Sequence, residues 1–261
     1  MRALTQDDAH IFCTVGQIHD EVKMIMTSID TMLEATGFTD IQVRLSTRPE
    51  KYSGQPELWD KATDALMSAL TELGKPFVIQ KGEGAFYGPK IEIHIKDSLG
   101  RSWQCGTIQL DFVQPENFDL TCINDHGKEE RVVVIHQAMY GSLERFMALL
   151  LEHHKGNLPL WLAPVQMAIL SITDQQNEYV SVIAQLFQDA GYRVQKDTSS
   201  DPLRGKIQKA QREKIPCVIT VGGKEQEAQT VSIRWKDGRL EHGIPLDRLI
   251  EYIKGIFSWK K

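Results

Sequence analysis

Polar side chains with metal-binding and hydrogen-bonding capacity are concentrated at the start of the chain. The stretch TQDDAHIF, residues 5–12, holds an amide in Gln6, a carboxylate in Asp8 and an imidazole in His10. In an extended strand alternate side chains share one face, so these three groups would converge there. Gln6 and His10 are also four residues apart, which is the spacing of neighbours on a helix, so a solvated first turn of a helix is the alternative.

Three later segments carry side chains that suit the binding of a small polar or anionic ligand. GEGAFYGPKIE is a glycine-bounded loop that leads into a strand, and glycines let a backbone approach a ligand closely. QCGTIQLDF places amide and hydroxyl groups on a strand. HQAMYGSLERF places an imidazole at a strand end and an arginine at a helix start, where it can bind phosphate or stack on a base. Each group also fits a structural role, as a core ring, a surface ion pair or a packed histidine. The residues concerned are Tyr87, Lys90, Gln104, Thr107, Gln109, His136 and Arg145.

The composition is that of a globular protein with 261 residues, of which 41% are hydrophobic and 25% charged. This length predicts two domains. No apolar run approaches the roughly 20 residues of a membrane span, and the start has no secretory pattern, so a cytoplasmic location is expected. The four cysteines show no CxxC spacing, and we expect reduced thiols at Cys13, Cys105, Cys122 and Cys217.

The net charge of −5 is unevenly distributed along the chain. From Ser171 onward basic residues outnumber acidic ones, whereas residues 1–170 are acidic. A local basic stripe can bind phosphate groups even on an acidic protein, and PLRGKIQKAQREK forms such a stripe. A solvated helix face is the alternative interpretation of this segment. The candidate phosphate-binding residues are Arg204, Lys206, Lys209 and Arg212.

The first part of the chain mixes helical and strand periodicities, which indicates an α+β domain. Apolar spacing predicts helices over residues 20–37 and 56–74, followed by a helix that begins near residue 141. Alternating apolar residues predict strands over 38–46, 90–97, 102–112 and 130–138, of which the second and third are antiparallel neighbours joined by a turn.

The second part has the pattern βαβαββα, which predicts an α/β domain with a mixed, mostly parallel sheet. A buried strand over residues 165–172 precedes an amphipathic helix over 176–191 and a strand over 192–197. The basic helix and a strand over 216–223 come next, then a hairpin over 230–243 with an Asp237–Gly238 turn. A last helix is predicted from Leu246.

Six segments, taken together and in order, closely resemble the C-terminal part of bacterial-type threonyl-tRNA synthetases, which are class II enzymes. They are TQDDAHIFC, LSTRPEK, GEGAFYGPKIE, QCGTIQLDF, IHQAMYGSLERF and WLAPVQ. The resemblance implies a catalytic domain with an antiparallel sheet over residues 1–163, truncated at its N-terminus, and an α/β anticodon-binding domain over 164–261. It also implies a threonine–tRNA ligase that uses ATP with Mg²⁺, forms threonyl-adenylate, transfers threonine to tRNA(Thr) and is a homodimer in its full-length form.

The resemblance also implies roles for individual residues. The family holds a zinc ion with one cysteine and two histidines, and His10 and His136 match the histidines. Zinc with three protein ligands keeps positions open for the amino and hydroxyl groups of threonine. Threonine recognition is expected from Gln6, Asp8, Tyr87 and Gln109, and catalysis from Arg145 and Lys90. ATP binding is expected from Gln104, Thr107, Ser142 and Arg145.

The chain departs from the family pattern at several points. It begins within the second class motif, so the first motif, the phosphate-binding arginine of the second and the cysteine zinc ligand would lie upstream. Leu4 stands where relatives carry a phenylalanine that stacks on adenine. The alternative function is therefore a catalytically inactive module that only binds tRNA or a protein partner. An unrelated zinc hydrolase is disfavoured because the sequence contains no HExxH motif.

Overall fold

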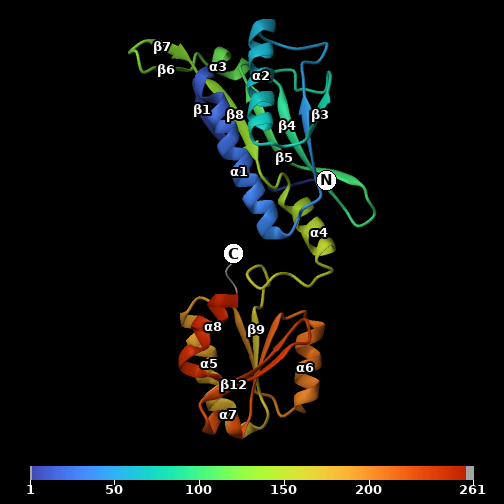
Figure 1. The fold of residues 1–261 in the computed structure, drawn as a ribbon, viewed down its shortest axis with the longest axis vertical. Coiled ribbons are helices and arrows are strands. Elements are labelled where there is room, and N and C mark those ends of the chain that lie inside the picture. The colour runs from blue at the N-terminus through green and yellow to red at the C-terminus, as the bar shows by residue number, and fades with distance from the viewer. Residues whose placement is uncertain (1, 257–261) are drawn as a thin grey trace. The chain divides into compact units, whose positions relative to one another are not determined.

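The computed structural model describes residues 2–256 and divides into two compact units, Met1–His153 and His154–Lys261 (Figure 1). The first unit is built on a six-stranded sheet with the order β1-β8-β5-β4-β2-β3, in which only β2 and β3 pair in parallel. Its strands are β1 (Ala9–Cys13), β2 (Ile41–Ser46), β3 (Phe77–Gln80), β4 (Lys90–Lys96), β5 (Ser102–Asp111) and β8 (Val133–Ala138). A two-stranded sheet pairs β6 (Thr121–Ile123) with β7 (Glu129–Arg131). The helices are α1 (Ile18–Thr36), α2 (Pro56–Glu72), α3 (Val113–Asn117) and α4 (Leu143–His153), with a 3-10 turn at Val15–Gln17.

The large sheet has one apolar and one polar face because its strands alternate in sequence. On β4 the side chains of Ile91, Ile93 and Ile95 are at most 1% exposed and form the core side. Figure 1 shows α1 and α2 lying along this sheet, and both helices bury an apolar stripe. The opposite face of β4 carries Lys90, Glu92 and His94, so the same strand supplies both the core and a polar surface.

Cross-strand pairing places one row of polar residues across the whole width of this sheet. Each strand contributes one residue to the row, and that residue lies directly opposite the row residue of the next strand in the sheet. The row reads His10, His136, Gln109, Lys90, Ser46 and Gln80. Residues that are far apart in sequence are thereby held about 5 Å apart by the sheet geometry.

The structure differs from the sequence prediction at four places in this unit. The single strand predicted over 130–138 is split, because β7 pairs with β6 while β8 joins the large sheet. The backbone changes partner at Val132, whose N–H donates to the carbonyl of Leu120. The short strands β3 and β6 were not predicted, and residues 5–8 precede β1, with only an isolated bridge between Gln6 and Ser142.

The second unit has a five-stranded sheet with the order β10-β9-β11-β12-β13. Its first three strands are parallel and the last two antiparallel, which confirms the predicted mixed sheet. The strands are β9 (Met167–Ser171), β10 (Val194–Asp197), β11 (Cys217–Val221), β12 (Thr230–Trp235) and β13 (Leu240–Pro245). The helices are α5 (Asn177–Asp189), α6 (Leu203–Arg212), α7 (Gly223–Glu227) and α8 (Leu249–Ile256), with 3-10 turns at Asp174–Gln176 and Leu246–Arg248.

Two apolar clusters hold this second unit together, one on each face of its sheet. Residues of α5 and α8 pack on one face around Phe187, which is fully buried. The apolar side of α6 packs on the other face around Ala210 and Val218.

No helix within residues 2–256 is long and apolar enough to cross a membrane. All four cysteines are free thiols, as expected.

Candidate functional site

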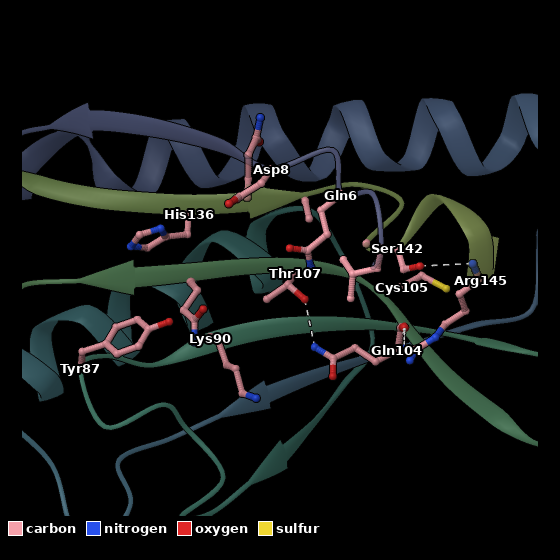
Figure 2. A pocket seen from close by; sticks show the side chains of 15 residues that line it. Gln6, Asp8, Tyr87, Lys90, Gln104, Cys105, Thr107, His136, Ser142 and Arg145 are labelled. Atoms are coloured by element: carbon pink, nitrogen blue, oxygen red, sulfur yellow. Dashed lines mark hydrogen bonds between the residues drawn. The ribbon is translucent and has the colours of Figure 1, made fainter. Parts of the chain in front are cut away.

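A cavity of about 430 Å³ lies on the polar face of the six-stranded sheet (Figure 2). It is lined by side chains from the N-terminal segment, β4, β5, β8 and the start of α4. All but one of the residues that the sequence singled out in the first unit line this cavity. They are Gln6, Asp8, Tyr87, Lys90, Gln104, Thr107, Gln109, His136, Ser142 and Arg145. Leu4 also lines it, whereas His10 lies beside it on β1.

The lining residues are distributed between two ends of the cavity. Figure 2 shows Asp8, His136 and Tyr87 towards one end and Gln104, Ser142 and Arg145 towards the other. Irregular pairing between β4 and β5 explains why Gln104 and Thr107, three residues apart, can meet on one face. The amide of Gln104 donates to the Thr107 hydroxyl at 2.9 Å. The cavity therefore has one end with an imidazole and carboxylate and another with an arginine.

Two carboxylates fix the N-terminal segment against the loop between β8 and α4. Asp7 accepts backbone N–H groups of Met139, Tyr140 and Gly141 at 2.7–3.2 Å. Glu144 accepts the N–H of Thr5 at 3.0 Å. Because Asp7 points into this loop, its neighbours on either side, Gln6 and Asp8, point into the cavity. Sequence reasoning missed Asp7, although alternation predicts that a residue between two site residues points to the opposite side of the segment.

Two glycines permit close backbone approach at the walls of the cavity. A Cβ atom at Gly88 would lie 1.9 Å from the carbonyl oxygen of Leu110, so the loop carrying Tyr87 can contact β5 only without a side chain there. Gly141 has a φ of 72°, and a Cβ atom on it would lie 2.4 Å from the carbonyl oxygen of Cys105. These contacts place the Tyr87 loop and the start of α4 on the edges of the site.

The two histidines predicted as metal ligands are brought together. His10 and His136 are direct cross-strand partners, and their ring centroids lie 4.6 Å apart. The Nε2 atom of His136 lies 3.0 Å from a carboxylate oxygen of Asp111, whose side chain is 1% exposed. Asp111 also accepts N–H groups of α3, so its position is fixed from two sides. Among residues 2–256, however, no group of three histidine, cysteine, aspartate or glutamate side chains is placed to hold a metal ion.

Lys90 is held by a carboxylate that sequence reasoning did not select. Its ammonium lies 2.5 Å from Glu92, a residue only 6% exposed. The second carboxylate oxygen of Glu92 accepts the hydroxyl of Ser46 at 3.3 Å. A buried carboxylate requires such partners, because an unpaired buried charge is strongly unfavourable. The alternation of Lys90 and Glu92 on β4 was the sequence signal that could have identified this pair.

The interaction of Glu144 leads to a prediction about pH. Hydrogen bonds from its own N–H, the N–H of Thr5 and the Ser142 hydroxyl lower the pKa of its carboxyl from 4.5 to about 2. A group whose pKa is lower in the folded state stabilises the protein fully above its unfolded pKa and loses this effect as pH falls through the folded value. We expect the free energy of unfolding to fall between about pH 4.5 and 2 partly for this reason.

Urea denaturation of the wild type and of Glu144→Gln at pH 5, 4 and 3 measures this effect. The wild type should lose more stability over this range than the variant, because only the wild type must protonate Glu144. Replacement of the exposed Glu34 by glutamine serves as the control and should retain the wild-type pH dependence. Parallel pH curves for wild type and Glu144→Gln would contradict the assigned role of Glu144.

In the second unit the basic helix is α6, and its cations differ in exposure. Arg204, Lys209 and Arg212 are exposed. Lys206 is only 2% exposed, and its ammonium donates to the backbone carbonyl and hydroxyl of Ser171 at 3.0 and 3.2 Å. The expectation that Lys206 contacts RNA is therefore corrected, because its charge is used inside the unit. Helical periodicity turns residue 206 towards the sheet, together with Ala210.

Comparison with known proteins bears on both units. Residues 1–154 match the family model described as "tRNA synthetase class II core domain (G, H, P, S and T)", and residues 165–256 match "Anticodon binding domain". The first match covers more than half of the chain.

The chain belongs to the class II tRNA synthetase family.

Its relatives within this family are threonine–tRNA ligases. It is 46% identical over 254 residues to that of Thermotoga sp. (strain RQ2), a match that covers 97% of this chain and 40% of the relative. It is 48% identical over 244 residues to that of Desulfosudis oleivorans, covering 94% of this chain and 38% of the relative. The chain thus spans about two fifths of the length of these relatives, and the predicted resemblance to threonyl-tRNA synthetases is confirmed.

Solved structures of synthetases have the same fold. A structure titled as the RNA binding domain of threonyl-tRNA synthetase from Cryptosporidium parvum Iowa II is 39% identical, with a TM-score of 0.90 over 97% of this chain and 64% of that one. A threonyl-tRNA synthetase from Aeropyrum pernix is 28% identical, with a TM-score of 0.84 over 98% and 63% of the two chains. The predicted fold class, a class II catalytic unit followed by an anticodon-binding unit, is confirmed.

Proposed function

We propose that this chain takes part in threonine activation and transfer to tRNA(Thr), with the cavity on the polar sheet face as the site of adenylate formation. The observation that carries this proposal is the convergence of ten predicted residues on one cavity with two chemically different ends. The kinship with threonine–tRNA ligases gives the substrates, because such a ligase joins threonine to tRNA(Thr) while ATP is cleaved to AMP and pyrophosphate.

The end with the imidazoles is the proposed threonine site. His10 and His136 suit two zinc ligands, since their rings are adjacent and Asp111 can orient the ring of His136 through Nε2. By family resemblance the third protein ligand is a cysteine, and residues 2–256 contain no group of three candidate ligands placed to hold a metal ion. When bound, zinc would accept the amino and hydroxyl groups of threonine as ligands.

The side chains around this end distinguish threonine from valine. The carboxylate of Asp8 is proposed to accept a hydrogen bond from the threonine hydroxyl. Gln6, Tyr87 and Gln109 are proposed to orient the amino acid. Valine has nearly the same shape but no hydroxyl, so it would leave the carboxylate of Asp8 without its partner. A site that hydrogen-bonds a substrate hydroxyl rejects the analogue without it far better than an apolar cavity does.

The other end is the proposed ATP site, with Mg²⁺ bound to the nucleotide. Lys90 and Arg145 supply positive charge for the phosphates, and Arg145 stabilises the charge that develops on departing pyrophosphate. Gln104, Thr107 and Ser142 provide further hydrogen-bonding groups for the nucleotide. Glu92 holds the Lys90 ammonium in place from the buried side, at 2.5 Å.

The second unit is proposed to bind the anticodon arm of tRNA(Thr). We retain residues 1–163 as the catalytic region and 164–261 as the anticodon-binding region, with a homodimeric full-length protein in the cytoplasm. A module that only binds tRNA or a protein partner is the second candidate. The match of residues 165–256 to an anticodon-binding domain favours it, because this unit could bind RNA without a catalytic partner.

Threonine-dependent exchange of pyrophosphate into ATP tests the activation step directly. With Zn²⁺ and Mg²⁺ present, the proposal expects exchange that requires threonine and is not supported by valine. Absence of exchange, combined with retained tRNA binding, would favour the module over the ligase.

Charge removal on α6 tests the RNA-binding role. Replacing Arg204, Lys209 and Arg212 together by alanine should weaken tRNA(Thr) binding and lower the slope of log K against log salt by roughly two to three, because each phosphate contact contributes about 0.7–0.9. Filter binding between 50 and 200 mM salt, the range over which such affinities change by orders of magnitude, provides the measurement.

The matched control for this experiment replaces Lys224, Arg239 and Lys254, which are basic residues outside α6. The control should keep the wild-type salt slope. Equal slopes for all three proteins would show that the exposed cations of α6 form only a solvated face. Lys206→Ala should instead lower the stability of the unit, since this ammonium is buried against Ser171.

A further inference from the structure

Arg145 is connected to the β4–β5 turn through an aromatic side chain outside the cavity. Its guanidinium carbon lies 5.6 Å from the centre of the Trp103 ring, within the range of a cation–π interaction. Its Nη1 atom also donates to the backbone carbonyl of Gln104 at 2.9 Å. Trp103 does not line the cavity, so any effect it has on a ligand must pass through a neighbouring residue.

Trp103 is itself held by a buried carboxylate. Its indole N–H donates to Asp97 at 2.9 Å, and the side chain of Asp97 is only 1% exposed. The Nε atom of Arg101 and the backbone N–H groups of Leu99 and Arg101 donate to the same carboxylate. Burial by itself would raise the pKa of Asp97, but hydrogen bonds from Trp103 and Arg101 prevail and lower it to about 2. The indole therefore has a fixed hydrogen-bond acceptor at neutral pH.

Holding an exposed arginine in one position has a clear physical advantage for binding. A free arginine side chain populates many rotamers, and ordering it opposes ligand binding. Contacts with an aromatic ring and a carbonyl restrict the guanidinium before the ligand arrives. Arg145 is exposed as a residue, so these two contacts are what orient it at the cavity wall.

We propose that Trp103 is a positioning residue for nucleotide binding, which holds the Arg145 guanidinium at the cavity wall while Asp97 holds Trp103. The inference rests on the proposed function, because it assumes that Arg145 contacts the nucleotide. It predicts that the ring of Trp103 affects affinity for MgATP although it touches no part of the ligand.

Calorimetric titration of the full chain with MgATP tests the proposal. Trp103→Leu should weaken binding by roughly three- to thirty-fold, the range expected for loss of a cation–π contact. Trp103→Phe keeps an aromatic face and should recover part of that loss, which a purely structural role would not predict. Trp235→Phe is the matched control, because Arg239 lies 5.4 Å from the Trp235 ring in the second unit, and it should bind MgATP like the wild type.

A second measurement detects the contact without ligand. In nitrogen-15 spectra the indole N–H signal of Trp103, identified by its loss in Trp103→Phe, should shift in Arg145→Leu. Thermal unfolding identifies variants that fail to fold. If Trp103→Leu is unfolded, Asp97→Asn replaces it, because this change removes the charge from the group that accepts the Trp103 indole N–H.

The outcomes separate this inference from the proposed function. If folded Trp103→Leu, or Asp97→Asn in its place, binds MgATP with the same affinity as the wild type, the inference is overturned and the proposed function is not. An unmoved Trp103 indole signal in Arg145→Leu also overturns it. Failure of the wild type itself to bind MgATP overturns the proposed nucleotide site, and the inference with it.

Discussion

Replacing His136 by alanine will lower the affinity of this chain for Zn²⁺ by more than about 100-fold, a larger loss than removal of an outer-shell partner causes. The physical reason is the loss of one of two adjacent imidazoles, whose ring centroids lie 4.6 Å apart. His10→Ala should have a similar effect. Competition with a chromophoric zinc indicator measures both affinities, and His126→Ala, a substitution on the turn between β6 and β7, serves as the control.

The role of Asp111 can be separated from that of the ligands in the same assay. Asp111→Asn keeps the shape of the side chain but removes the charge beside Nε2 of His136, and it should lower zinc affinity by roughly 10- to 100-fold. Affinities for His136→Ala and His10→Ala equal to that of His126→Ala would show that zinc, if bound, is held elsewhere. The wild-type affinity itself should be weak, because no third ligand is in place among the described residues.

Substitution of Arg145 by alanine will weaken MgATP binding by roughly 10- to 100-fold, the range for loss of hydrogen bonds to a charged group. Arg145→Lys should recover little of this loss, because a lysine lacks the planar group that donates to the Gln104 carbonyl and is proposed to contact the nucleotide as well. Arg131→Ala removes one positive charge from β7, away from the cavity, and controls for net charge. Calorimetric titration measures the MgATP affinity of all four proteins. Equal affinities for the wild type and Arg145→Ala would show that Arg145 does not contact the nucleotide.

The strand geometry of the site could be predicted from sequence because it depends on local alternation. The isoleucines of β4 define the buried face, so Lys90 had to lie on the other one. The segments that carry the family resemblance then supplied the cavity residues of β5 and β8, such as Gln109 and His136. What alternation cannot give is the register between strands, which placed His10 directly opposite His136.

The features that sequence reasoning missed depend on contacts between distant segments. Asp7 binds backbone groups of residues 139–141, and such acceptors leave no trace in the sequence of the partner loop. Glu92 was overlooked because a charged residue in an alternating strand suggests a solvated position, yet it is 6% exposed. Lys206 was assigned to RNA from its charge alone, although helical spacing placed it on the side of α6 that faces the sheet.

The central claim is that one cavity recognises threonine at one end and the nucleotide at the other. A non-hydrolysable threonyl-adenylate analogue spans both ends of the cavity. Its valyl counterpart has a methyl group in place of the hydroxyl that is proposed to donate a hydrogen bond to Asp8. Calorimetric titration of the full chain with both analogues in the presence of Zn²⁺ is the most direct test. The account predicts that the threonyl analogue binds, that the valyl analogue binds at least about 100-fold more weakly, and that Asp8→Ala reduces this difference. Equal affinity for the two analogues, or no binding of either, would contradict it.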